Sequence, residues 1–162
     1  MRTDELAAAV IAALTKRSLT ACTAESCTGG GVGHALTAIS GSSAAYLGGV
    51  ISYTNEVKNQ LLGVPKKTLE QFGAVSAETA RAMCEGVRRL VGADFGVSIT
   101  GLAGPNGDGS GKPVGLVYIG CSGRTDTVVE EFVFDGNRSE IRLQALDAAL
   151  QILLSQITKT GT

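Results

Sequence analysis

The sequence has little of several residue types on which common catalytic and binding sites depend. Among its 162 residues there is one histidine, His34, so a Ser-His-Asp triad or a histidine-rich zinc site would have to use it. His34 falls within a helical pattern of apolar residues, which favours a surface or packing role. Positive charge does not predominate either: 14 lysines and arginines stand against 15 aspartates and glutamates, for a net charge of -1. We therefore expect no nucleic-acid partner and no attraction to an anionic membrane.

Long apolar runs are also missing. No stretch reaches the roughly 18 apolar residues of a membrane-spanning helix, and Asp4 and Glu5 interrupt the start of the chain, where a secretory signal would be apolar. The cysteines form no Cys-x-x-Cys pair and lie among apolar or small residues, as reduced core thiols do; they are Cys22, Cys27, Cys84 and Cys121. These features predict a cytoplasmic protein. The length and an apolar content of 44% favour one domain over residues 1–162.

Glycine, by contrast, is abundant, with 22 residues that fall mostly in turns. The most informative group lies at residues 23–31, between an apolar run at 19–24 and a helical pattern at 32–39. A strand that enters a helix through such a turn leaves backbone N–H groups at the helix start facing a ligand. The side chains there that could act on a bound molecule are Glu25, Ser26, Cys27 and Thr28. The alternative is that these residues only cap the helix and allow close packing.

A second glycine-rich segment, residues 101–113, follows a buried-strand pattern at residues 94–100. Long loops of this kind usually bind a ligand or move, although a flexible surface connection is the alternative. The loop lacks the phosphate-binding pattern of nucleoside triphosphatases, because Asn106 stands where the first glycine is required and Pro113 follows Lys112.

Hydrophobic patterns predict the other elements. Helices are expected at residues 3–16, 32–39, 56–62, 65–72, 76–91 and, after a turn at 135–140, up to about 157, with Thr3 or Asp4 capping the first. Strands are expected at residues 19–24, 46–53, 94–100, 114–121 and 127–134, the last two as a hairpin. This order predicts an α/β protein, a three-layer α/β/α sandwich with a mixed, mostly parallel sheet.

Three further residues could belong to a site at the strand ends. Tyr53 and Lys58 follow the strand at 46–53, so they could converge with Ser26, although an ordinary lysine there would be a solvated helix charge. Arg138 begins the last helix, where the helix dipole disfavours a cation. We therefore expect Arg138 to pair with a carboxylate or a phosphate.

Several short motifs, taken together and in this order, resemble those of the CinA C-terminal domain family, whose stand-alone members are nicotinamide-nucleotide amidohydrolases. They cover nearly the whole chain, at residues 23–30 (Thr-Ala-Glu-Ser-Cys-Thr-Gly-Gly), 41–43 (Gly-Ser-Ser), 53–58 (Tyr-Thr-Asn-Glu-Val-Lys), 73–76 (Gly-Ala-Val-Ser), 100–105 (Thr-Gly-Leu-Ala-Gly-Pro), 112–115 (Lys-Pro-Val-Gly) and 136–138 (Gly-Asn-Arg).

The resemblance implies an enzyme of pyridine nucleotide salvage that hydrolyses the carboxamide of nicotinamide mononucleotide to nicotinic acid mononucleotide and ammonia. In that family the serine of the first motif is taken as nucleophile and the lysine of the third as its base, with the tyrosine before it assisting; here these are Ser26, Lys58 and Tyr53. A desolvated lysine with a lowered pKa is a suitable base where no histidine is available. The implied acyl-enzyme route requires no metal and no cofactor.

Substrate binding would fall to residues of the same motifs: Thr28, Gly29, Gly30, Ser42, Ser43, Asn55, Gly101, Ala103, Gly104 and Arg138. Backbone N–H groups between Cys27 and Gly30 are candidates for stabilising an oxyanion. The phosphate could lie against the loop at 101–111, against Ser42-Ser43, or against Arg138, and the sequence does not rank these three.

Three alternatives stay open. Cys27 instead of Ser26 could be the nucleophile. The chain could be a non-catalytic module that binds a nucleotide, since the same loops and hydroxyls would bind without turnover. It could also be a structural domain that contacts partners in competence or DNA-damage responses. A homo-oligomer, such as a symmetric dimer formed through the region of Leu47 and Val50, is a further expectation.

Overall fold

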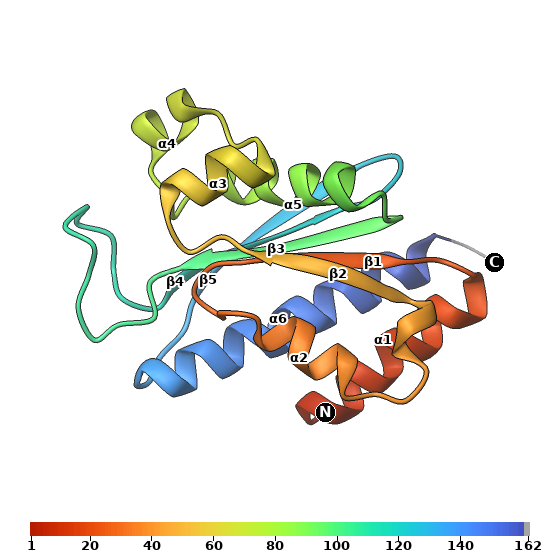
Figure 1. The fold of residues 1–162 in the computed structure, drawn as a ribbon. Coiled ribbons are helices and arrows are strands. Elements are labelled where there is room, and N and C mark those ends of the chain that lie inside the picture. Colours follow the sequence, from red (N-terminus) through yellow and green to blue (C-terminus); the bar gives the residue numbers. More distant parts are fainter. Residues whose placement is uncertain (161–162) are drawn as a thin grey trace.

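The computed structural model describes residues 1–160, and its centre is one five-stranded sheet (Figure 1). The strands are β1 (Ala21–Glu25), β2 (Tyr46–Ile51), β3 (Phe95–Gly101), β4 (Leu116–Ser122) and β5 (Thr127–Val133), in the order β2-β1-β3-β4-β5. β2, β1 and β3 run parallel, β4 is antiparallel to β3, and β5 is antiparallel to β4. The described part of the sheet is therefore mixed and mostly parallel, as the sequence predicted, and the structure shows that β4 is the reversed strand.

Helices cover both faces of this sheet, which confirms the three-layer arrangement (Figure 1). One face carries α1 (Thr3–Arg17), α2 (Gly31–Thr37) and α6 (Arg138–Lys159); the other carries α3 (Asn55–Leu62), α4 (Lys66–Phe72) and α5 (Ala77–Val91). A short 3₁₀ helix, η1 (Ser42–Ala44), precedes β2.

The predicted cap of the first helix was wrong. The cap is Arg2, whose backbone N–H donates to the Glu5 carboxylate at 2.9 Å. Thr3 instead donates from its hydroxyl to Asp147 on α6 at 2.6 Å, so it ties two helices together. A capping pattern in sequence does not reveal a partner that lies far along the chain.

The core is divided by the sheet. Every residue of β1 is buried, as expected of an interior parallel strand. Cys22 and Ala24 point to the side of α5, where they pack with Leu62 and Met83, whereas Ala21 belongs to the larger cluster under α1 and α6. A fully buried leucine or isoleucine contributes roughly 1.5–3 kcal/mol, so the long α6 stabilises the fold strongly. All four cysteines are free and buried, as predicted.

α5 lies very close to the sheet because small residues face it. A Cβ added at Gly96 would lie 2.5 Å from the carbonyl oxygen of Cys84, and one at Gly120 would lie 2.9 Å from that of Ala80. Ser98 uses the same closeness, since its hydroxyl donates to the Ala80 carbonyl at 2.7 Å. Bulky side chains at these positions would push α5 off the strands.

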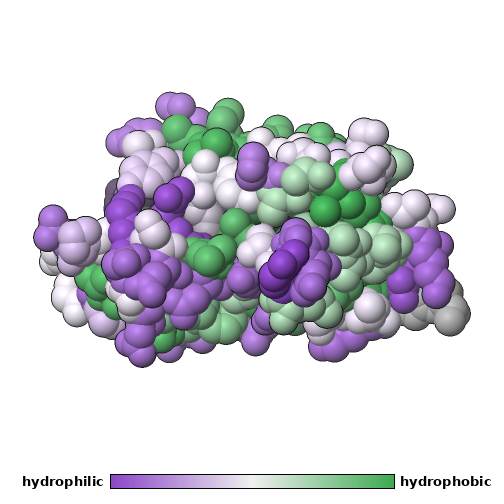
Figure 2. Space-filling view, turned by 90° about the horizontal axis from the view of Figure 1, so that it is seen from below, coloured by the Kyte–Doolittle hydropathy of each residue, from purple (hydrophilic) through white to green (hydrophobic). Residues whose placement is uncertain are grey.

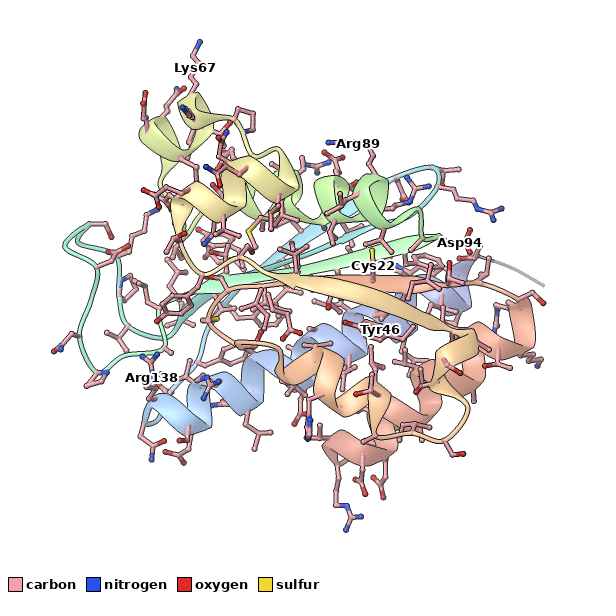
Figure 3. All side chains as sticks on the ribbon, in the orientation of Figure 1. Cys22, Tyr46, Lys67, Arg89, Asp94 and Arg138 are labelled. Atoms are coloured by element: carbon pink, nitrogen blue, oxygen red, sulfur yellow. The ribbon has the colours of Figure 1, made fainter. Side chains whose placement is uncertain are left out.

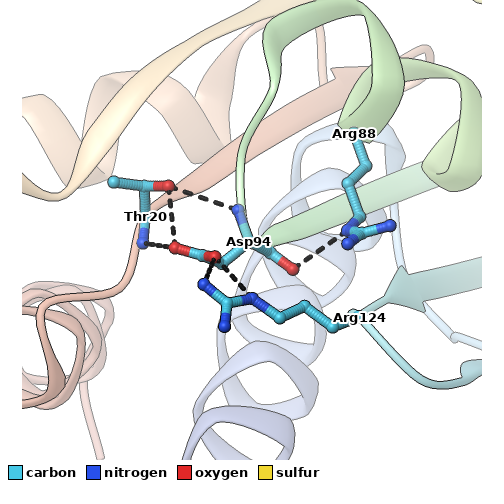
Figure 4. A network of polar contacts seen from close by, with 4 residues as sticks. All are labelled: Thr20, Arg88, Asp94 and Arg124. Atoms are coloured by element: carbon cyan, nitrogen blue, oxygen red, sulfur yellow. Dashed lines mark hydrogen bonds and ion pairs between the residues drawn. The ribbon is translucent and has the colours of Figure 1, made fainter.

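A polar network fixes the starts of β1 and β3 to each other (Figure 4). Asp94 accepts hydrogen bonds from the backbone N–H and the hydroxyl of Thr20, at 2.9 and 3.1 Å, and from Nε of Arg124 at 2.9 Å. Arg88 on α5 donates to the Asp94 carbonyl at 3.1 Å. This network holds the parallel register from one end, so that both strands finish at the same edge of the sheet.

The surface is mixed in character. Seen from the side of α1, α2 and α6, hydrophilic residues gather over the start of α6 and the adjoining loop (Figure 2). On the edge strand β2, Leu47 is exposed and Val50 half-buried, and the expected dimer contact there stays a prediction. Within residues 1–160, none of the helices has both the length and the apolar character to cross a membrane.

Candidate active site

The site lies where β1, β2 and β3 end. The register pairs Glu25 with Ile51 and with Ile99, so the turns that follow the three strands leave the sheet at one edge. Ligands in open α/β sheets bind at such carboxyl ends. A cavity of about 290 Å³ opens there. It is lined by Ser26, Cys27, Tyr53, Lys58, Ala74, Val75, residues 100–104, residues 106–108 and Arg138.

Lys58 is the most unusual of these residues, because it lies on α3 yet points inward and is only 1% exposed. Its Nζ lies 3.1 Å from Oγ of Ser26, 2.8 Å from the carbonyl oxygen of Ser52 and 3.4 Å from that of Tyr53. Burial lowers the pKa of Lys58 from 10.5 to about 8, because the charged form loses its hydration. The interpretation of Lys58 as a solvated helix charge is therefore wrong.

The three contacts of Lys58 suit a neutral amine. An unprotonated Nζ has two hydrogens and one lone pair. The carbonyls of Ser52 and Tyr53 can accept both hydrogens, which leaves the lone pair for the hydroxyl proton of Ser26. The two carbonyls can only accept, so they take both hydrogens of a neutral Nζ. The hydroxyl of Ser26 must then donate its proton to the lone pair of Lys58. Serine is thereby placed beside a base.

The turn after β1 is closed by Glu25, in a way that the sequence did not reveal. The Glu25 side chain is buried, and its carboxylate accepts from the hydroxyl of Thr28 at 2.6 Å and from the backbone N–H groups of Val32 and Gly33 at 2.9 and 3.0 Å. The start of α2 is therefore occupied by an anion of the protein itself. The expectation that N–H groups at the helix start face a ligand is therefore wrong for Val32 and Gly33, and also for Gly29 and Gly31, which donate to the carbonyls of Ser26 and Thr28. For Thr28 and Gly30 it stays a prediction.

Other groups of the turn are engaged as well. The N–H of Ser26 donates to the carbonyl of Ile99 at 3.0 Å, and that of Gly29 donates back to the Ser26 carbonyl at 3.1 Å. From α6, Arg142 donates through Nε to the carbonyl of Cys27 at 3.0 Å and through Nη2 to that of Thr28 at 3.3 Å. Sequence reasoning missed Arg142; the available signal was its place four residues after Arg138 on one helix.

Cys27 lines the cavity beside Ser26 but differs from it chemically. Its side chain is buried, and burial raises the pKa of the Cys27 thiol to about 11, mainly by desolvating the thiolate. The thiol therefore stays protonated at neutral pH and is a poor nucleophile.

Tyr53 and Arg138 form the mouth of the cavity. Tyr53 is 62% exposed, and its hydroxyl lies 3.5 Å from Nη2 of Arg138. Nη1 of Arg138 donates to the carbonyl of Gly104 at 2.7 Å, which ties the long loop to α6. Figure 3 shows Arg138 at the start of α6, at the end of the molecule where this loop protrudes. Its side chain is bound to a carbonyl and a hydroxyl and retains donors that can face an anion.

The structure brings together some of the predicted site residues and separates others. Those that line the cavity are Ser26, Lys58, Tyr53, Gly101, Ala103, Gly104 and Arg138. Thr28 lies behind them, bonded to Glu25, and Gly29 and Gly30 face Arg142 and Ile51. Asn55 lines a different groove, beside α4. Ser42 and Ser43 belong to η1, which precedes β2 and so lies at the opposite edge of the sheet from the cavity.

Two cavity residues had no signal in the sequence beyond the loop that contains them. Asn106 and Asp108 reach the cavity because the loop folds back toward the α4–α5 connection. Lys112 fixes that position, since its Nζ donates to the carbonyl of Phe72 at 2.8 Å and also to that of Val75. The loop is thus attached at both of its sides, by Lys112 and by Arg138.

Comparison with known proteins gives consistent matches. The model of the CinA C-terminal domain family matches residues 3–157. A CinA-like protein of Synechococcus sp. (strain RCC307) is 58% identical over 120 residues, 74% of this chain and 29% of that protein. A CinA-like protein of Gemmatimonas aurantiaca is 48% identical over 150 residues, 93% of this chain and 35% of that protein. The chain thus spans about a third of the length of these relatives.

Solved structures agree with this. The competence/damage inducible protein CihA from Agrobacterium tumefaciens is 43% identical, with a TM-score of 0.91 over 94% of both chains. A Competence-Damaged Protein (CinA) superfamily protein from Klebsiella pneumoniae is 34% identical, with a TM-score of 0.95 over 98% of this chain and 99% of that one.

Proposed function

Because the chain belongs to the CinA C-terminal domain family, we propose that it is an amidohydrolase that converts nicotinamide mononucleotide to nicotinic acid mononucleotide and ammonia. The observation that carries the proposal is the contact of 3.1 Å between Nζ of the buried Lys58 and Oγ of Ser26, inside a cavity. Hydrolysis of an amide requires an activated nucleophile, and a lysine with a lowered pKa activates serine. The choice of substrate follows from the resemblance of the motifs.

The first half of the reaction forms an acyl-enzyme. Oγ of Ser26 bonds to the carboxamide carbon while its proton passes to the neutral Nζ of Lys58, and the carbonyl oxygen becomes an oxyanion. The C–N bond then breaks, and the protonated Lys58 gives its proton to the departing nitrogen, so ammonia leaves. The carbonyls of Ser52 and Tyr53 hold Lys58 in place throughout, because they accept from it in both protonation states.

The second half repeats these steps with water. A water molecule attacks the ester carbon, Lys58 takes its proton, and the collapse of the intermediate returns a proton to Ser26. The products are the starting enzyme and the carboxylic acid, which becomes the carboxylate by losing its proton to solvent. Backbone N–H groups directed at the oxyanion would accelerate both halves of the reaction. In comparable sites each such donor lowers the activation free energy by roughly 3 kcal/mol.

Arg138 is the residue that we assign to the phosphate of the substrate. It lies at the mouth of the cavity, whereas Ser42 and Ser43 lie at the opposite edge of the sheet. Ser42 and Ser43 are therefore too far from the cavity to bind the phosphate. A guanidinium binds phosphate oxygens through several donors at once. With the phosphate at Arg138, the other end of the ligand extends toward Ser26.

Ser26 is favoured over Cys27 as nucleophile on two grounds. Nζ of the base Lys58 lies 3.1 Å from Oγ of Ser26, and the raised pKa of Cys27 keeps its thiol protonated. Replacing Ser26 with alanine should therefore abolish turnover, whereas Cys27→Ala should keep activity within about tenfold of wild type, since it changes packing alone.

The test is incubation of the purified protein with nicotinamide mononucleotide, with ammonia and the acid product measured together. We expect product from wild type and from the control Ser155→Ala, an exposed serine of α6, and none above background from Ser26→Ala or Lys58→Met. If calorimetry shows that wild type binds the nucleotide but no product forms, catalysis is refuted. The alternative, a non-catalytic module that binds a nucleotide, would then be supported. Full activity of Ser26→Ala would refute the assigned nucleophile.

A further inference from the structure

Arg142 holds the turn that carries Ser26, although it lies on α6 and outside the cavity lining. It donates to the carbonyls of Cys27 and Thr28, at 3.0 and 3.3 Å. These carbonyls belong to consecutive peptide groups, so one planar guanidinium fixes the orientation of both. Gly29 permits this approach: its φ is +60°, and a Cβ there would lie 3.3 Å from Nη2 of Arg142.

The orientation of the carbonyls decides where the N–H groups point. In a planar trans peptide the N–H is opposite the C=O, so a Cys27 carbonyl directed at α6 turns the N–H of Thr28 away from α6. The bond from Gly29 to the Ser26 carbonyl closes a β-turn over residues 26–29. That bond leaves the N–H groups of Cys27 and Thr28, the two central residues, outside the turn's own hydrogen bonding.

The N–H that follows a nucleophilic serine is a common oxyanion donor in acyl-transfer enzymes. We propose that Arg142 is a positioning residue for the N–H groups of Cys27 and Thr28, which face the oxyanion formed during attack by Ser26. It orients the Thr28 N–H through the Cys27 carbonyl, and it orients the Cys27 N–H through the next peptide group, whose Gly29 N–H donates to the Ser26 carbonyl. The proposal rests on the proposed amide hydrolysis. Arg142 itself contacts neither substrate nor the reacting atoms; it acts through the two peptide groups that it binds.

The primary test compares Arg142→Ala and Arg142→Lys with wild type. We expect kcat for nicotinamide mononucleotide to fall about 100-fold in Arg142→Ala, because a small misplacement of a catalytic group slows a reaction by about this factor. Binding should change little: in a Ser26→Ala background, the calorimetric Kd for the nucleotide should stay within about threefold. Arg89→Ala is the matched control, because Arg89 lies on α5, on the far side of the sheet (Figure 3).

A rescue experiment separates orientation from folding. Guanidinium ion at millimolar concentration should restore part of kcat in Arg142→Ala, because it can refill the space and donate to both carbonyls, and should not do so in Arg142→Lys, whose ammonium fills part of that space. Unfolding in urea, measured beside it, shows whether the variant is folded. A kcat within about threefold of wild type in folded Arg142→Ala would overturn the proposal.

A fluorophosphonate probe makes the test independent of the natural substrate. Oγ of Ser26 bonds to phosphorus, the P–F bond breaks, fluoride leaves, and the hydroxyl proton passes to Lys58. We expect wild type to gain the adduct mass on Ser26 and Arg142→Ala to label about 100-fold more slowly, as expected for lost oxyanion donors. If wild type labels but releases no ammonia, the proposed substrate fails while the role of Arg142 stands. If both proteins label equally fast, the role of Arg142 fails alone, and if neither labels, both proposals fail.

Discussion

Replacing Lys58 with methionine should change how the stability of the protein depends on pH. In the folded chain Lys58 has a pKa of about 8, lowered by burial, whereas in the unfolded chain it has the ordinary value of 10.5. Between these values the unfolded state binds one more proton than the folded state. The free energy of unfolding of wild type therefore rises with pH through this range.

The size of the effect follows from the two pKa values. The difference of 10.5 and about 8 corresponds to about 3 kcal/mol, at 1.36 kcal/mol for each pH unit. Methionine has a similar length and no titratable group, so the variant lacks this contribution at every pH. The loss of hydrogen bonds to the Ser52 and Tyr53 carbonyls also destabilises the variant, but that loss does not vary with pH and cancels when two pH values are compared.

The assay is unfolding in urea at a series of pH values from 7 to 10.5, for wild type, Lys58→Met and the control Lys67→Met. Lys67 projects outward from α4 (Figure 3). Groups such as Cys22 and Tyr118, whose pKa values are raised to about 12 by burial and by the Glu131 hydrogen bond, respectively, affect all three proteins equally. Relative to Lys58→Met, wild type should gain about 3 kcal/mol from the lowest to the highest pH. Parallel curves for these two proteins would show that Lys58 keeps its proton, and would refute its role as a base.

Three further predictions use other features. The kcat/KM of wild type should rise about tenfold for each pH unit below pH 8 and level off above it, because only neutral Lys58 accepts the serine proton; a pH-independent rate would contradict this. Glu25→Gln should lower the free energy of unfolding by about 2 kcal/mol, since an amide must present an N–H to one of its donors, while exposed Glu56→Gln should be neutral in the same urea titration. Gly86→Ala should cost about 2 kcal/mol or more, because its Cβ would lie 1.8 Å from a carbonyl oxygen at the end of α3. Gly107→Ala, whose Cβ would have nothing nearer than 4.0 Å, is the control, and equal melting temperatures for both would contradict the packing described.

The fold was accessible from the sequence because its signals are local. Apolar patterns predicted α3 and α5, and their caps Thr54 and Ser76 each accept the N–H three residues further along, at 3.3 and 3.1 Å. The alternation of apolar and small residues predicted β3, and the turn after residue 121 predicted the hairpin of β4 and β5. Boundaries moved by a few residues, as at α6, which extends to Lys159.

The site was only partly accessible, because its geometry depends on contacts between distant segments. The resemblance indicated Ser26 and Lys58, but residue patterns alone favour an exposed lysine at position 58, since helix α3 is short and largely polar. Arg142 contacts a turn at sequence separations of 114 and 115, and its place four residues after Arg138 shows the helix face that it shares but not the turn that it binds. Ser42 and Ser43 show the converse: a motif next to others along the chain can lie at the opposite edge of the sheet.

The buried carboxylate of Glu25 has a consequence for how an elongated ligand is admitted. It already fills the place at the start of α2 where a phosphate would otherwise settle, and its negative charge repels a second anion there. Arg138 lines the cavity and Glu25 does not, so the anionic end of an elongated ligand finds its cationic partner at the mouth of the cavity and none at the start of α2. The proposed substrate would therefore enter with its uncharged end leading toward Ser26.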